Sequence, residues 1–316
     1  MPKLRWIMTD NNAGPDGQLA GFRYGDLLKK YGLNTKSTTK RLVDTVTRPS
    51  IAGLVNSIAA APELYTVGSS YNSVIVAQAS GLCEGFVTFG AASQLHLRRA
   101  EERQGGGGKV SRTLYLVPPS IDAHRLFSFA GMVKSAASLR ITLWNNALSV
   151  RTKVEVPGSS KMFSPQKSKL SRIFFSTPTH AAQSIASTSK ADENTTRPSP
   201  FMTSWLSSMR QRAVLGVDNT IDVFDLRSWY QGHRQGEVLD FHKIMSEAPK
   251  LPLNEEIPAM SIVGAIHSIS FWEKDLGIDN SGQSRGTVDA LNLNLLGAVL
   301  LISDPDDFKR SANFRK

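Results

Sequence analysis

The chain has 316 residues, of which 41% are hydrophobic and 20% charged, and this ordinary globular mixture excludes wholesale disorder. The single cysteine, Cys83, excludes a disulfide framework and a zinc site built from cysteines. No apolar run approaches the roughly 18 residues that cross a bilayer, and the first residues turn polar by Thr9, unlike a secretory signal. We therefore expect an intracellular protein, in the cytoplasm or the nucleus.

The charge is distributed unevenly along the chain. The formal net charge is +10, from 37 Lys and Arg against 27 Asp and Glu. Residues 1–215 hold 27 basic and 12 acidic residues, whereas residues 216–307 hold 6 basic and 15 acidic residues. A basic body attracts polyanions such as nucleic acid or an anionic membrane, and an acidic part can complement it between neighbouring copies. The alternative is that two solvent-exposed surfaces carry net charges of opposite sign and neither surface binds a partner.

The first half of the chain carries helix and strand patterns in turn. Residues 1–20 are rich in Asn, Asp and Gly and predict a flexible arm. The predicted helices cover residues 26–31 (ended by Gly32), 50–61 (ended by Pro62) and 122–137, with Ser120 or Asp122 as the cap. The predicted strands are residues 71–79 and 82–89, paired through a turn at Ser80-Gly81, then 110–117, and two strands within 139–156 that turn near Asn145-Asn146.

The second half begins with a compositional break. Residues 157–200 contain ten Ser, five Thr and five Pro, which predicts a linker or long surface loop. Beyond it we expect helices within 201–215 and 236–248, and strands at 220–226, 261–271 and 288–302. Gly297 is expected to mark a bulge or bend in the last strand.

These elements predict a mainly β fold with a few helices, of the α+β class, with two β-sandwich-like halves joined by a basic linker rich in Ser, Thr and Pro. The expected division of the chain is an N-terminal arm with short helices (1–62), a β-rich domain (63–156), the linker (157–200), and a second β-rich, acidic domain with a basic tail (201–316).

The motifs give no support for catalysis. The run of glycines before Lys109 fails as a phosphate loop, because Arg103 and Val110 stand where such a loop needs Gly and Ser or Thr. The six histidines lack metal-site spacing. Two acidic sets remain as candidates for a metal-dependent enzyme: Asp218, Asp222 and Asp225, and Asp304, Asp306 and Asp307. Strand alternation and turn formation explain both sets without a metal, so we expect no cofactor, no metal and no catalytic residue.

Basic residues interleaved with aromatic rings are typical of single-strand binding, since rings stack on bases while cations follow the backbone. Arg140 with Trp144, Arg172 with Phe174 and Phe175, and Arg227 with Trp229 and Tyr230 have this pattern, although such rings also belong to cores. The candidate polyanion contacts are Lys29, Lys30, Lys40, Arg41, Arg98, Arg99, Lys109, Arg112, Arg151, Lys153, Lys161, Lys167, Lys169 and Arg172.

Together these features favour a non-enzymatic, self-assembling structural protein of the viral coat, nucleocapsid or matrix type. Its expected partners are single-stranded RNA, another nucleic acid or an anionic lipid surface, and further copies of itself. The first alternative is a nucleic-acid-binding accessory or transport protein of the movement type. The second is a metal-dependent enzyme that uses an acidic cluster.

Overall fold

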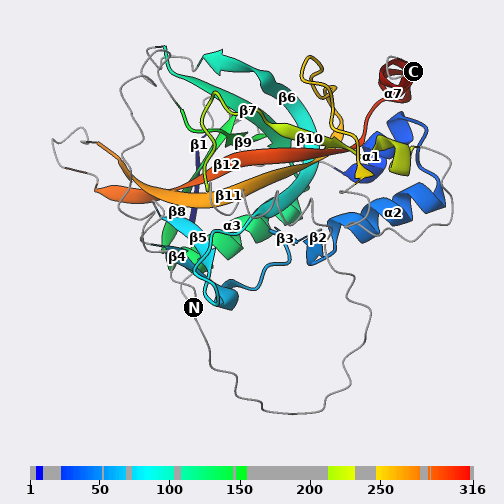
Figure 1. Cartoon of the computed structure of the whole chain (residues 1–316). Coiled ribbons are helices and arrows are strands. Elements are labelled where there is room, and N and C mark those ends of the chain that lie inside the picture. The colour runs from blue at the N-terminus through cyan, green and yellow to red at the C-terminus, as the bar shows by residue number, and fades with distance from the viewer. Residues whose placement is uncertain are drawn as a thin grey trace, which may run out of the picture.

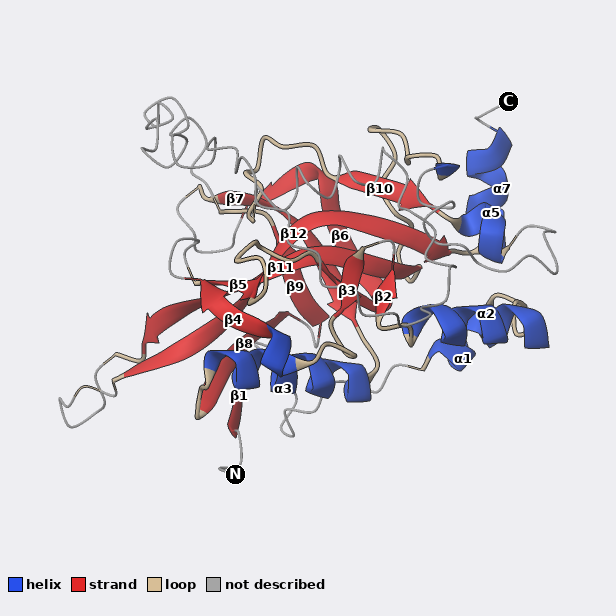
Figure 2. Cartoon of the chain, turned by 60° about the horizontal axis from the view of Figure 1, so that its bottom comes forward, coloured by secondary structure: helices blue, strands red, loops and turns tan. Residues whose placement is uncertain are grey.

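The computed structural model describes residues 5–9, 23–51, 53–68, 73–102, 108–144, 147–154, 213–231, 247–277, 284 and 286–313. Strands predominate among these residues and helices are few, which confirms the predicted α+β class (Figures 1 and 2). The strands are β1 (Arg5–Thr9), β2 (Ser50–Ile51), β3 (Leu54–Asn56), β4 (Tyr65–Gly68), β5 (Val74–Ala77), β6 (Phe86–Glu102), β7 (Val110–Val117), β8 (Ser138–Trp144), β9 (Ala147–Arg151), β10 (Asp222–Asp225), β11 (Ile262–Asp275) and β12 (Thr287–Ile302).

The helices lie around this sheet. They are α1 (Tyr24–Lys30), α2 (Lys36–Val46), the short 3₁₀ turn η1 (Pro62–Leu64), α3 (Ser120–Lys134), α5 (Arg227–Tyr230) and α7 (Pro305–Asn313). Helices α1, α2 and α7 gather at one end of the sheet, and α3 runs along one face (Figures 1 and 2). No helix in the described part of the chain is long and apolar enough to span a membrane.

All the described strands belong to one sheet that curls on itself. The strand order is β2-β3-β6-β7-β9-β8-β12-β11-β5-β4, with β1 beside β8 and β10 beside β12. Additional pairings join β6 to β11 and β9 to β12, so the path through β6, β7, β9, β12 and β11 returns to β6. Such closure requires strong curvature, which gives the sheet an inner and an outer side.

The proposed boundary between two β-rich halves does not coincide with a break in this sheet. Strand β11 pairs with β6 over Ile262–His267, and β12 runs parallel to both β8 and β9. One hydrophobic core contains residues from both parts of the chain, such as Phe86 and Ile266. The division into two halves is therefore not confirmed, and residues 157–200, the expected linker, lie outside the described residues.

Helix α3 covers an apolar face of the sheet, as its sequence pattern predicts. The Phe129 ring packs against Tyr65 and Phe86, with ring centroids 5.4 and 5.5 Å apart. Such tilted and edge-to-face contacts add to the gain from burying the rings. The helix ends where Ser135 adopts a left-handed conformation with φ of 55°.

Several other predicted elements are confirmed. Strand β7 occupies residues 110–117, β8 and β9 form the hairpin expected within 139–156, and α1, β10, β11 and β12 lie where predicted. The bend near Gly297 is also present. Gly297 pairs with Ile266 and Leu295 pairs with His267, so Leu296 is an extra residue in β12, as in a β-bulge. The predicted helix in 236–248 lies almost wholly outside the described part of the chain. Residues 201–212 of the helix expected within 201–215 lie outside it as well, and residues 213–215 are not helical.

The predicted helix over residues 50–61 is wrong. Gly53, with φ of 82°, turns the chain between β2 and β3, and β3 then pairs with β6. The buried Asn56 side chain holds this turn, because its amide donates to the carbonyls of Val46 and Arg48 at 2.8 Å each. Pairing with a distant strand has outweighed the local helical pattern.

Three further expectations need correction. Within the predicted arm, residues 5–9 form β1, parallel to β8. Helix α2 occupies residues for which the sequence predicted no element, and Thr35 caps it by accepting from the Thr38 N–H at 3.2 Å. The predicted hairpin of 71–79 and 82–89 is reduced to a turn at Gly81 and one bridge between Val76 of β5 and Cys83, which precedes β6. Strands β5 and β6 find their main partners elsewhere in the sheet.

Candidate nucleic-acid interface

A polar groove of about 360 Å³ lies on one side of the curled sheet. Its walls come from β6, β7, β8, β9 and β11. Strands β7 and β11 are not neighbours in the sheet order, yet both contribute side chains to the groove. The groove therefore lies within the curve of the sheet, where residues far apart in sequence face one another.

Strand alternation explains why this groove is polar. On β7, Ser111, Thr113 and Tyr115 face the groove, while Leu114 and Leu116 between them are fully buried in the core. The same alternation sends every second residue of β8 and β9 to the groove. The groove is thus the polar face of strands whose other face builds the core.

Three aromatic and three basic side chains line the groove together. They are Tyr115, Trp144, Trp272, Arg140, Arg151 and Lys274. Trp272 is the most accessible ring, at 46% exposed, whereas Tyr115 is 8% exposed. The Tyr115 and Trp144 rings lie in contact, with centroids 6.3 Å apart. The combination offers ring faces for stacking and cations for phosphates within one concavity.

Only one of the predicted polyanion contacts, Arg151, lines this groove. Arg140 and Trp144, which the sequence pattern paired as a basic residue with a ring, lie there as well. The other side chains of the groove were missed. Alternation within 138–144 and 147–151 was the available signal for β8 and β9, but nothing in the sequence shows that β11 brings Trp272 and Lys274 to the same place.

A second group of predicted contacts forms an exposed basic surface on α1 and α2. Lys29 and Lys30 end α1, and Lys40 lies on α2, all three exposed. We call these three lysines the α1–α2 lysines. They lie at the helical end of the molecule (Figure 1), and none of them lines the groove. Arg99, Lys109 and Lys153 are exposed too, at separate positions before or beside the groove strands.

Three predicted contacts make internal hydrogen bonds. Arg98 donates to the backbone carbonyls of Ile221, Leu251 and Glu255 at 2.8 to 3.0 Å. Burial lowers the pKa of its guanidinium. This arginine ties β6 to the residue before β10 and to the segment that leads into β11.

Arg112 and Arg41 act in the same way. Arg112 donates to the carbonyls of Leu97, Arg98 and Val217 at 2.6 to 2.7 Å. Arg41 on α2 donates to the Trp229 carbonyl of α5 at 2.7 Å. These guanidinium groups join segments distant in sequence. The remaining candidates, Lys161, Lys167, Lys169 and Arg172, lie outside the described residues.

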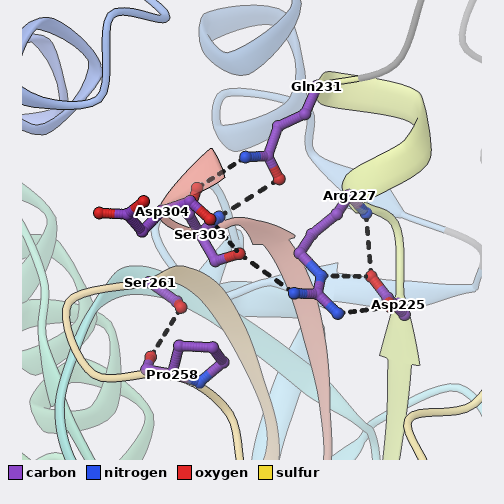
Figure 3. Close-up of polar contacts among 7 residues, drawn as sticks. All are labelled: Asp225, Arg227, Gln231, Pro258, Ser261, Ser303 and Asp304. Carbon is purple, nitrogen blue, oxygen red and sulfur yellow. Dashed lines mark hydrogen bonds and ion pairs between the residues drawn. The ribbon is translucent and has the colours of Figure 1, made fainter. Parts of the chain in front are cut away.

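Four of the six acidic residues considered for metal binding, namely Asp222, Asp225, Asp306 and Asp307, lie in ion pairs. Asp225 is buried and accepts two hydrogen bonds from the Arg227 guanidinium, both at 2.9 Å (Figure 3). Asp222 lies 3.0 Å from the Lys250 ammonium. In Figure 3 the Asp304 carboxylate points away from Asp225. Among the described residues, no three His, Cys, Asp or Glu side chains gather closely enough to hold a metal ion.

A buried chain of polar side chains crosses the core away from the groove. The His267 Nε2 atom and the Thr88 hydroxyl are 2.8 Å apart, and Thr88 and Ser57 share a hydrogen bond of 2.7 Å. All three side chains are fully buried. Burial lowers the pKa of His267 to about 4, so its ring is neutral at pH 7. None of these three residues lines the groove.

No protein family, curated protein or solved structure matches this chain.

Proposed function

We propose that this chain is a non-enzymatic structural protein that binds single-stranded nucleic acid in the groove and assembles with further copies along it, in the manner of a viral coat, nucleocapsid or matrix protein. One observation carries the binding: rings and cations from four strands line a single concavity. Each stacked base contributes about 1–3 kcal/mol, and each cation near a phosphate releases counterions.

Nucleic acid suits this groove better than a membrane surface. The groove cations Arg140, Arg151 and Lys274 lie in a concavity within the curved sheet, which a flexible strand enters and a flat bilayer does not. The partly exposed rings of Trp144 and Trp272 offer flat faces for bases. The exposed α1–α2 lysines would add backbone contacts at the other end of the molecule.

The uneven charge supports the assembly part of the proposal. Residues 216–307 carry 15 acidic and 6 basic residues, against the basic excess of the preceding part of the chain. Opposite charges on different surfaces of one chain attract neighbouring copies, and salt weakens this attraction.

The test is light scattering during size-exclusion chromatography, starting at high salt and stepping down to physiological salt. Each step is repeated with single-stranded RNA, with single-stranded DNA and with anionic liposomes. Growth into large particles with nucleic acid supports the proposal. Binding at a constant size identifies an accessory binder, growth only on liposomes identifies a membrane-lining protein, and indifference to all three ligands overturns the proposal.

A further inference from the structure

The groove has an acidic wall beside its basic one. Glu101 and Glu102, the last residues of β6, line it together with the hydroxyl groups of Ser111, Thr113, Thr142 and Ser149. Carboxylates repel phosphates, so a site that bound only the phosphate backbone would be weakened by them. Their place in this groove suggests a ligand group that donates hydrogen bonds.

Glu101 is held in a defined position in this wall. Its Oε2 atom accepts a hydrogen bond from the Tyr115 hydroxyl at 3.1 Å, and its Oε1 atom lies 3.6 Å from Nε2 of His96. A carboxylate offers about four lone-pair positions, so these contacts leave room for another donor. The side chain is 27% exposed, so a ligand in the groove can reach it.

The hydroxyl groups of the wall complement the carboxylates. Ser111 and Thr113 are almost fully buried and hydrogen-bond to each other at 3.2 Å, whereas Thr142 is exposed and Ser149 half-buried. A Ser or Thr hydroxyl both donates and accepts, while a carboxylate accepts only. A ligand hydroxyl group therefore finds an acceptor and a donor within the same groove.

We propose that this wall of carboxylates and hydroxyls recognises the ribose 2′-hydroxyl and so selects single-stranded RNA over DNA. The inference rests on the nucleic-acid binding proposed above. The 2′-hydroxyl is the group by which a protein distinguishes the two polymers, and acidic side chains bind ribose hydroxyls in other nucleotide sites. A deoxyribose brings no donor, so the phosphates of DNA would meet the carboxylates without compensation.

The test compares three oligonucleotides of about 12 nucleotides by fluorescence anisotropy: oligouridylate, its 2′-deoxy analogue and its 2′-O-methyl analogue. Uracil lacks an exocyclic amino group, which removes contacts between carboxylates and base amines from the comparison. The 2′-O-methyl group accepts but does not donate. We expect the full chain to bind oligouridylate about tenfold more tightly than either analogue, the effect of one hydrogen bond to a charged group.

The informative variant is Glu101→Gln with Glu102→Gln. Loss of negative charge should tighten binding of both analogues, while the preference for oligouridylate falls to about twofold or less. The matched control is Glu273→Gln, an exposed carboxylate on β11 whose neighbours Trp272 and Lys274 line the groove while it does not. This control should keep the tenfold preference.

Two results overturn the inference while leaving the proposed function intact. One is equal affinity of the original chain for all three oligonucleotides. The other is an unchanged preference in the double variant, with all three ligands bound more tightly by the same factor. If the original chain binds none of them, the proposed function fails, and the sugar selection fails with it.

Discussion

The indole ring of Trp144, at the end of β8, contacts the phenol ring of Tyr115 on β7, with 6.3 Å between their centroids. Strand β9 lies between these strands, and its residues at this point are small, with Ala147 paired to Trp144 and Ser149 paired to Tyr115. Small side chains on the middle strand let the two large rings meet above it. Because Glu101 also fixes the Tyr115 hydroxyl, the Trp144 ring is supported before a ligand binds, which lowers the entropy cost of binding.

We expect the two tryptophans of the groove to stack on bases. Trp144→Ala and Trp272→Ala should each weaken single-stranded RNA binding by about 1–3 kcal/mol, measured by fluorescence anisotropy. Trp272→Phe should retain most of the affinity, since it keeps a ring. Leu253→Ala, at a side chain 66% exposed and outside the groove, is the control. Full affinity in both alanine variants would show that these rings do not contact the ligand.

The groove cations should determine the salt dependence of binding. Replacing Arg140, Arg151 and Lys274 by Gln should make the slope of log K against log salt shallower by about 2. The reason is that each phosphate contact with a single strand contributes roughly 0.7 to this slope. Replacing the three α1–α2 lysines by Gln measures the contribution of that surface in the same titration. If the slope falls only with the lysine substitutions, the nucleic acid runs over the helices and not through the groove.

Arg112 should be needed chiefly for folding. Arg112→Met removes the donors of three carbonyl groups and should lower the free energy of unfolding by about 3 kcal/mol or more, measured by urea denaturation. Lys109→Met, at an exposed position near the start of the same strand, should change stability by less than about 0.5 kcal/mol. Equal stability of the two variants would contradict this role.

The buried pair of Asp225 and Arg227 should behave as one unit. Arg227 is fully buried and also donates to the Ser303 hydroxyl at 3.2 Å (Figure 3). Its guanidinium lies over the Phe308 ring of α7. Asp225→Asn or Arg227→Met alone should destabilise the protein by about 3–5 kcal/mol, because the partner charge stays buried. The double variant should cost less than the sum of the two, and additive effects in this cycle would contradict the coupling.

His267 should make the fold sensitive to acid. Its pKa is lowered to about 4 in the folded chain, against about 6.5 when unfolded, so only the unfolded state gains a proton between these values. The free energy of unfolding should be highest above pH 6.5 and fall by about 3 kcal/mol as the pH drops to 4, from this group alone. In His267→Gln this part of the pH dependence should disappear. An identical pH profile in the variant would assign the acid sensitivity to other groups.

The sequence by itself determined the class of the fold and many of its elements. Strand-forming runs identified β7, β8, β9, β11 and β12, with period-two alternation in β7 and in residues 290–295 of β12. The helical pattern identified α3, since its apolar side chains return to one side at each turn. The basic residue and ring at Arg140 and Trp144 indicated part of the groove, and a polyanion partner stays a prediction from the net charge of +10.

The tertiary structure alone decided which of these residues lie together. The curl of the sheet brings Trp272 and Lys274 of β11 opposite β7, across more than 150 residues of chain. It also gives Arg98 and Arg112 internal carbonyl partners that no local pattern shows. Residues 50–51 and 54–56 became strands for the same reason, because β6 offers backbone hydrogen bonds to β3. Local sequence sets which side of an element is polar, whereas long-range pairing sets what that polar side faces.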